Sequence, residues 1–170
     1  SSDLENWKEV SRRRIPSTKD NSAYCEKNWM PILDKPYHYV KWLNPVEIVK
    51  YDGEKTHIEK LINQNLPLIK DLRGGSQIVE INGFYYCVAH ETNLWINPRN
   101  GQKDATYRSR LVKMNKEFEI INVSDEFTIM DGLIEFCCGL AYKDNFVYIT
   151  FGMQDRSEEH TSELQSPCNL

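Results

Sequence analysis

The sequence lacks any long apolar run, and this absence limits how the chain can relate to a membrane. No stretch of about 18 apolar residues occurs, so no segment is expected to cross a bilayer as a helix. The chain also lacks an excess of positive charge, because its 21 basic residues are outnumbered by 25 acidic ones among 170 residues. Without a basic stripe, the sequence does not predict nucleic-acid binding.

Cysteine is scarce, with five in the chain, and none shows the spacing of a zinc site. Cys137 and Cys138 are adjacent within a predicted strand, so their side chains are expected to point to opposite faces. We expect Cys25, Cys87, Cys137 and Cys138 to be buried free thiols. Free thiols favour a cytoplasmic location, and the compartment is otherwise left open.

The last fifteen residues lack apolar periodicity and are expected to be no part of the fold. Residues 156–166 resemble the in-frame translation of a short-read sequencing adapter, so 156–170 are predicted to be a disordered artefact. Leaving them out changes the 21 basic and 25 acidic residues to 20 and 22. The chain begins at Ser1 without a methionine, and residues 1–155 are expected to be part of a longer protein.

A strand–turn–strand pattern recurs three times and predicts an all-β fold. The clearest copy is centred on Asn82-Gly83, which lies between two apolar runs; a type I′ turn there needs positive φ at both residues. The other copies have turns at residues 34–36 and 143–145. In their flanking segments, such as 37–42, 134–142 and 146–152, apolar and polar residues alternate, and β-branched and aromatic residues are frequent. Both features are typical of strands.

Further strand-like runs follow the first two copies, at residues 46–51, 57–62, 106–114 and 118–123. Four short strands in each unit of about 50 residues are typical of a propeller blade. The stretch 93–104 is expected to be an irregular loop that carries a functional insertion. The sequence therefore predicts a partial β-propeller over residues 1–155, with about three antiparallel four-stranded blades that end near residues 25, 70 and 130.

Four segments resemble, in the right order, motifs of the five-bladed β-propeller glycosidases that include the β-mannoside phosphorylases and hydrolases. Residues 2–7 (SDLENW) are similar to a signature that closes one blade, and 26–28 (EKN) to the start of the third blade. The segment from GGS at 74–76 to His90 resembles the fourth-blade hairpin. The segment from FCCG at 136–139 to FGMQD at 151–155 resembles the fifth blade, and EKNW at 26–29 is also similar to propellers attached to glycosyltransferases.

The resemblance implies cleavage of manno-oligosaccharides with inversion, by water or by inorganic phosphate as a co-substrate, and no other cofactor. Paired groups must flank the scissile bond, and the family's general acid would lie before Ser1. No catalytic residue is therefore expected in this chain. The resemblance implies instead a substrate or phosphate pocket made by Lys27, Asn28, Arg73, Gly75, Ser76, His90 and Asp155.

Each of these assignments has a structural alternative that the sequence leaves open. Lys27 is either a ligand or a surface lysine, Arg73 either a ligand or the partner of Asp71, and His90 either a ligand or a histidine bonded to backbone. The two glycines at 74 and 75 suit close approach to a ligand or to a neighbouring chain segment. Arg108 and Arg110 share one face of a strand, where they contact an anionic ligand or solvent.

Three classes of function remain at this point. The first is a carbohydrate-active enzyme acting on a glycan, either a mannoside phosphorylase or hydrolase or a glycosyltransferase-like protein. The second is a non-catalytic sugar-binding propeller attached to a glycosyltransferase. In the third, the propeller is a scaffold for protein contacts.

Overall fold

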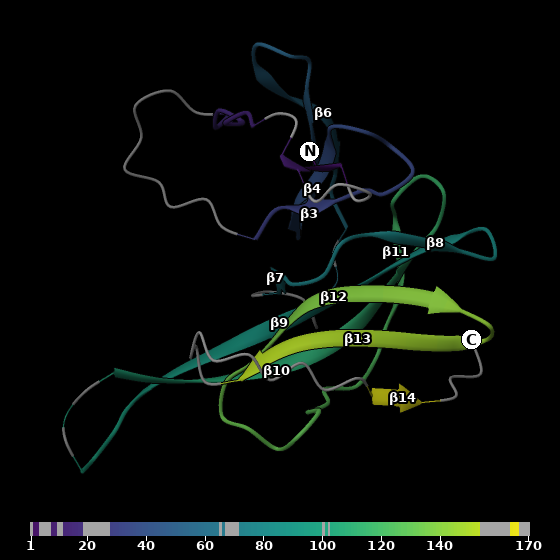
Figure 1. Cartoon of the computed structure of the whole chain (residues 1–170). Helices are drawn as coiled ribbons and strands as arrows, with labels where there is room; N and C mark the ends of the chain where they lie inside the picture. The colour runs from purple at the N-terminus through teal and green to yellow at the C-terminus, as the bar shows by residue number, and fades with distance from the viewer. Residues whose placement is uncertain are drawn as a thin grey trace.

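The computed structural model describes residues 2–3, 8–9, 12–18, 28–64, 66, 72–99, 101, 103–153 and 164–166. Over these ranges it consists of strands and turns, and three successive antiparallel sheets make up its body (Figure 1). The predicted all-β class is confirmed. A two-residue pair, β1 (Ser2–Asp3) with β2 (Lys8–Glu9), precedes the sheets. No helix in the described ranges is long and apolar enough to cross a membrane.

The first sheet is a meander of four strands in chain order. It contains β3 (Met30–Pro31), β4 (His38–Leu43), β5 (Val46–Tyr51) and β6 (Thr56–Ile62). Along β5, Val46, Ile48 and Val49 are buried, while β6 is mostly exposed and forms the outer edge. The three strands β4, β5 and β6 lie where the sequence pattern predicts strands.

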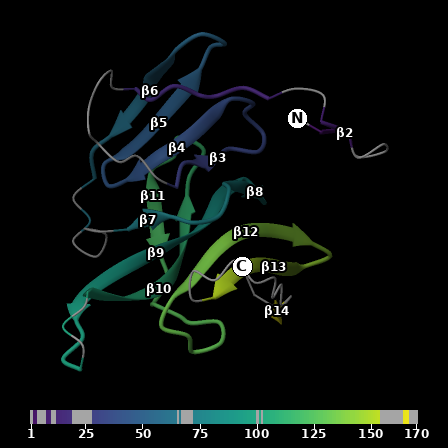
Figure 2. The same ribbon diagram turned by 60° about the vertical axis from the view of Figure 1, so that its left-hand side comes forward.

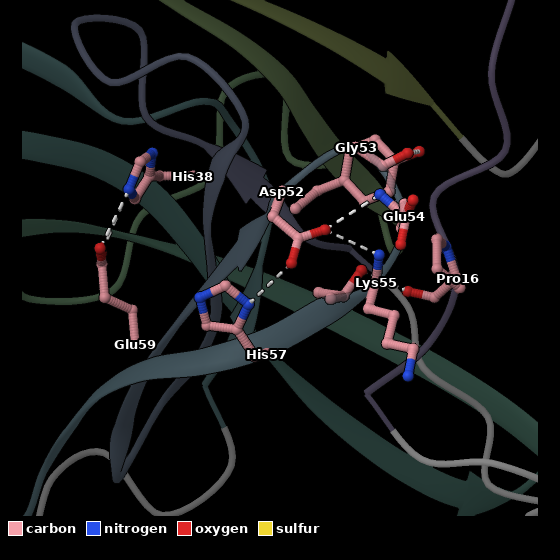
Figure 3. A network of polar contacts seen from close by, with 10 residues as sticks. Pro16, His38, Asp52, Gly53, Glu54, Lys55, His57 and Glu59 are labelled. Carbon is pink, nitrogen blue, oxygen red and sulfur yellow. Dashed lines mark hydrogen bonds and ion pairs between the residues drawn. The ribbon is translucent and has the colours of Figure 1, made fainter.

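The turn between β5 and β6 is organised by Asp52, as Figure 3 shows. One carboxylate oxygen of Asp52 accepts the backbone N–H groups of Lys55 and Glu54, each at 2.9 Å, and these bonds lower the pKa of Asp52. The Thr56 hydroxyl next to this turn donates to the Pro16 carbonyl at 2.7 Å. That bond fastens the described segment 12–18 to the first sheet (Figure 3).

The second sheet has the order β11-β10-β9-β7, and β8 also pairs with β9. Its strands are β7 (Arg73–Gly74), β8 (Val79–Ile81), β9 (Phe84–Ile96), β10 (Lys103–Met114) and β11 (Ile120–Val123). The predicted turn between β8 and β9 is confirmed, with φ of 50° at Asn82 and 85° at Gly83. Such values fit a type I′ turn, which sets the register of the hairpin.

The prediction of an irregular loop at 93–104 is wrong. β9 and β10 remain paired as far as Ile96 and Lys103, and their ends project from the sheets as a two-stranded ribbon (Figure 1). The turn itself is confined to residues after Ile96, where Asn97 accepts the N–H of Arg99 at 3.0 Å. The polar residues of this stretch occupy strand positions because the continued backbone ladder satisfies their main-chain groups.

The third sheet contains β12 (Glu135–Lys143), β13 (Phe146–Met153) and β14 (Leu164–Ser166). The predicted turn at 143–145 is confirmed, with positive φ at Asp144 and Asn145. Cys137 is buried and Cys138 exposed, as expected for opposite faces, although Cys138 lies in a bulge that shifts the register of β12 against β13. The prediction that all four thiols are buried is therefore wrong for Cys138. It is confirmed for Cys87 and Cys137, and Cys25 lies outside the described residues.

The second sheet lies between the other two and packs on both of its faces (Figures 1 and 2). From β9, Tyr85, Cys87 and Ala89 join the core shared with the first sheet. Tyr86 and Val88 of the same strand join the core shared with the third sheet. This two-sided burial explains why β9 is a nearly continuous apolar run, since a strand covered on both faces has no polar side.

Candidate functional site

Three chain segments meet around Gly74 and Gly75, close to where β3, β7 and β12 begin. A Cβ on Gly74 would lie 2.2 Å from the carbonyl oxygen of Asn28, which lies just before β3 of the first sheet. A Cβ on Gly75 would lie 2.6 Å from the Val88 carbonyl oxygen and 2.9 Å from that of Cys137. The glycines are therefore needed for close approach to neighbouring chain segments, which is one of the two alternatives that the sequence left open.

Two predicted site residues, Arg73 and His90, are brought together as direct partners across β7 and β9. Direct cross-strand partners place their side chains on the same face of a sheet. The Arg73 side chain is exposed and forms no ion pair with any residue in the described part of the chain. Arg73 thus places a positive charge at the edge of the second sheet, and Asp71, the partner that the sequence offered for it, lies outside the described residues.

His90 is almost fully enclosed, with 2 % of its surface exposed. Its ring stacks on Tyr107, with 4.8 Å between centroids, and meets the edge of Phe136 from β12 at 5.3 Å. Desolvation, with a smaller contribution from the Arg73 charge, lowers the pKa of His90 to about 4. The imidazole is therefore neutral at pH 7 and presents one donor and one acceptor nitrogen.

Three buried polar atoms gather on the face of β9 and β10 that carries His90. His90 Nδ1, Ser109 Oγ and Thr92 Oγ1 are buried, and none has a hydrogen-bond partner among the residues that the structure describes. Ser109 is the cross-strand partner of His90, and Thr92 is two residues further along β9, so all three share one face. An unsatisfied buried polar group costs about 1–3 kcal/mol, so this cluster lowers the stability of the second sheet.

The remaining predicted site residues have different surroundings. The Ser76 hydroxyl accepts the Val88 N–H and donates to the Gln77 carbonyl, both at 2.9 Å, so it fastens this segment to β9. Asn28 has a left-handed φ of 60° and is partly buried beside Gly74. Lys27 and Asp155 lie outside the described residues.

Glu135, at the start of β12, was not singled out by the sequence analysis although it is only 1 % exposed. Its carboxylate accepts the backbone N–H groups of Met130 at 2.9 Å, of Gly132 at 2.7 Å, and of Ile129. These bonds hold the segment between β11 and β12 against the start of the third sheet. An acidic residue that opens an apolar strand was the only sequence signal for this role.

A second side chain missed from the sequence is Gln77, which links the second sheet to the third. Its side-chain amide donates to the Leu140 carbonyl at 2.6 Å and accepts the Leu140 N–H at 3.3 Å. In the described part of the chain, no three His, Cys, Asp or Glu side chains gather as a metal site would require.

No family model, no curated protein and no solved structure matches this chain.

Proposed function

We propose that the three sheets are consecutive blades of a five-bladed β-propeller. Two of them are antiparallel sheets that begin with their first strand at one edge, in the orders β3-β4-β5-β6 and β7-β9-β10-β11. A propeller repeats such sheets around a central channel, with each sheet packed face to face on the next. The two separate cores on either side of the second sheet support this arrangement.

The contacts between neighbouring sheets support the same proposal. Ile32 and Ile78 form a parallel bridge, in which Ile78 donates to the Pro31 carbonyl at 2.8 Å. Equivalent strands of blades related by rotation about one axis run in the same direction, so a parallel contact is expected between inner strands. Gln77 makes the corresponding connection to β12 in the third sheet.

The function proposed for this propeller is recognition of a glycan, most specifically a mannoside, at the end where the first strands begin. The observation that carries the proposal is the exposed Arg73, which has no ion-pair partner among the described residues and lies across from neutral His90. A guanidinium donates to sugar hydroxyls and binds phosphate in a bidentate manner. The resemblance also assigns Lys27 and Asp155 to this pocket, and both lie outside the described residues.

Two forms of this function are considered. In the first, the protein is a glycoside phosphorylase or hydrolase, or a glycosyltransferase-like protein, and this chain supplies the substrate or phosphate pocket. In the second, it is a non-catalytic sugar-binding module. Glu135, whose carboxylate accepts three backbone N–H groups, is assigned a structural role in both forms.

The test is incubation of the full chain with β-mannobiose, with and without inorganic phosphate, together with a binding titration. Phosphate-dependent release of mannose 1-phosphate would establish a phosphorylase, and release of free mannose alone a hydrolase. Saturable binding without turnover would establish the sugar-binding module, and Arg73→Gln should then weaken binding about tenfold or more. Arg99→Gln is the matched control in the exposed ribbon turn. Absence of both turnover and binding would contradict the proposal.

A further inference from the structure

A cavity of about 300 Å³ lies beside β10, outside the site described above. Arg108, Glu126, Phe127, Thr128 and Asp131 line it. Arg108 directly precedes Ser109 on β10, so the two side chains point to opposite faces of the second sheet. The cavity is therefore separate from the face that carries His90.

The wall of this cavity is held in place by backbone hydrogen bonds. Phe127 and Ser109 exchange two such bonds, at 2.9 and 3.0 Å, and the Tyr107 N–H donates to the Leu133 carbonyl at 2.8 Å. Glu135 fixes the part of the segment between these two points through its three N–H contacts. A cavity lined by a segment anchored in this way is preorganised, which lowers the entropic cost of binding.

Several polar groups of the cavity have unused hydrogen-bonding capacity. Arg108 uses Nη1 to donate to the carbonyls of Tyr107 at 3.0 Å and Gly132 at 3.5 Å, while its Nε and Nη2 groups bond to no described residue. Asp131 accepts the Thr128 hydroxyl at 2.6 Å through Oδ1, which leaves Oδ2 unused within the described structure. The cavity thus offers a guanidinium edge and carboxylate oxygens, whereas the Phe127 side chain, as the bridge partner of Ser109, lies on the opposite face with the core of the third sheet.

This combination of groups selects the chemistry of the ligand. A simple cation would be repelled by Arg108, and a simple anion by Glu126 and Asp131. A neutral ligand with several hydroxyl groups both donates to the carboxylates and accepts from the guanidinium. A volume at the lower end of ligand pockets, about 300–1,000 Å³, fits one small residue.

We propose that the cavity lined by Arg108, Glu126, Phe127, Thr128 and Asp131 binds a single neutral saccharide residue. It shares only the class of ligand with the function proposed above. Only β9 separates β10 from β7, so the axes of these two strands lie about 10 Å apart, and the two sites are on opposite faces. Each site can therefore bind without the other.

The test is a residue-resolved NMR titration of the full chain with methyl β-D-mannopyranoside, with glycine as a second probe. Saturable shifts are expected at the backbone amides of Phe127, Thr128 and Asp131. Asp131→Asn and Glu126→Gln should each weaken the binding measured there about three- to tenfold, because each removes a charged hydrogen-bond acceptor. Asp144→Asn is the matched control, since Asp144 is an exposed aspartate with a similar positive φ.

The outcomes separate this proposal from the proposed function. Shifts at the cavity that persist in Arg73→Gln support an independent saccharide site. If the mannoside shifts only residues around Arg73, the cavity proposal is wrong and the proposed function stands. If glycine shifts the cavity amides and the mannoside does not, the cavity binds zwitterions, and the saccharide assignment is overturned. Loss of the cavity shifts in Arg73→Gln would contradict independence.

Discussion

Replacing Glu135 by glutamine should destabilise the fold, because the carboxylate is bonded to three backbone N–H groups. A glutamine oxygen can still accept from Met130 and Gly132, but its NH₂ group then faces the N–H of Ile129. One buried donor is left unsatisfied, at a cost of about 1–3 kcal/mol, and two charge-assisted bonds become neutral ones. We expect Glu135→Gln to lose about 2–4 kcal/mol of unfolding free energy.

The assay is urea unfolding combined with hydrogen exchange of the three amides that Glu135 binds. Glu117→Gln is the control, since Glu117 is exposed and surface substitutions usually change stability by about 0.5 kcal/mol or less. Exchange of the Ile129, Met130 and Gly132 amides should accelerate in Glu135→Gln alone. Equal stability of the two variants, with unchanged exchange, would refute the role assigned to Glu135.

Three further predictions concern the packing and the buried groups of the second sheet. Gly75→Ala should lower the free energy of unfolding by about 1–3 kcal/mol or more, because its Cβ would lie 2.6 and 2.9 Å from two backbone oxygens; Gly152→Ala, with nothing within 4 Å, should be neutral in the same urea titration. Because the pKa of His90 falls from 6.5 to about 4 on folding, the unfolded state binds its proton more tightly. Stability should therefore drop by up to about 3 kcal/mol as pH falls from 6.5 to 4 and level off below, and His90→Gln should remove this part of the pH profile. Ser109→Ala should leave stability unchanged or raise it by about 1 kcal/mol, because the hydroxyl has no partner in the described part of the chain, and a clear loss on urea unfolding would contradict this.

The turns and the all-β fold class could be predicted from the sequence because their signals are local. Asn82-Gly83 and Asp144-Asn145 adopt the positive φ values that their residue types tolerate, and the flanking alternation predicted the strands. The ribbon formed by the ends of β9 and β10 could not be predicted in this way. Its residues are polar and mixed, and they are strands because each is paired with a partner across the ribbon.

The candidate site could be predicted only where one hairpin determined it. Arg73 and His90 are partners because β7 and β9 belong to the same local unit. The roles of Glu135, Gln77 and Ser109 depend on backbone groups and strands brought together by the packing of different segments. No residue pattern within any single segment indicates which buried polar group finds a partner and which does not.

The most direct test of the proposed function is an NMR titration of the full chain with β-mannobiose, observing the Arg73 side chain and the amides of Gly74 and Gly75. Glycan recognition at the start of the first strands predicts saturable shifts at these three residues, with binding weakened about tenfold or more by Arg73→Gln and unchanged by Arg99→Gln. Shifts that avoid Arg73 and both glycines, or no shifts at all, would contradict it.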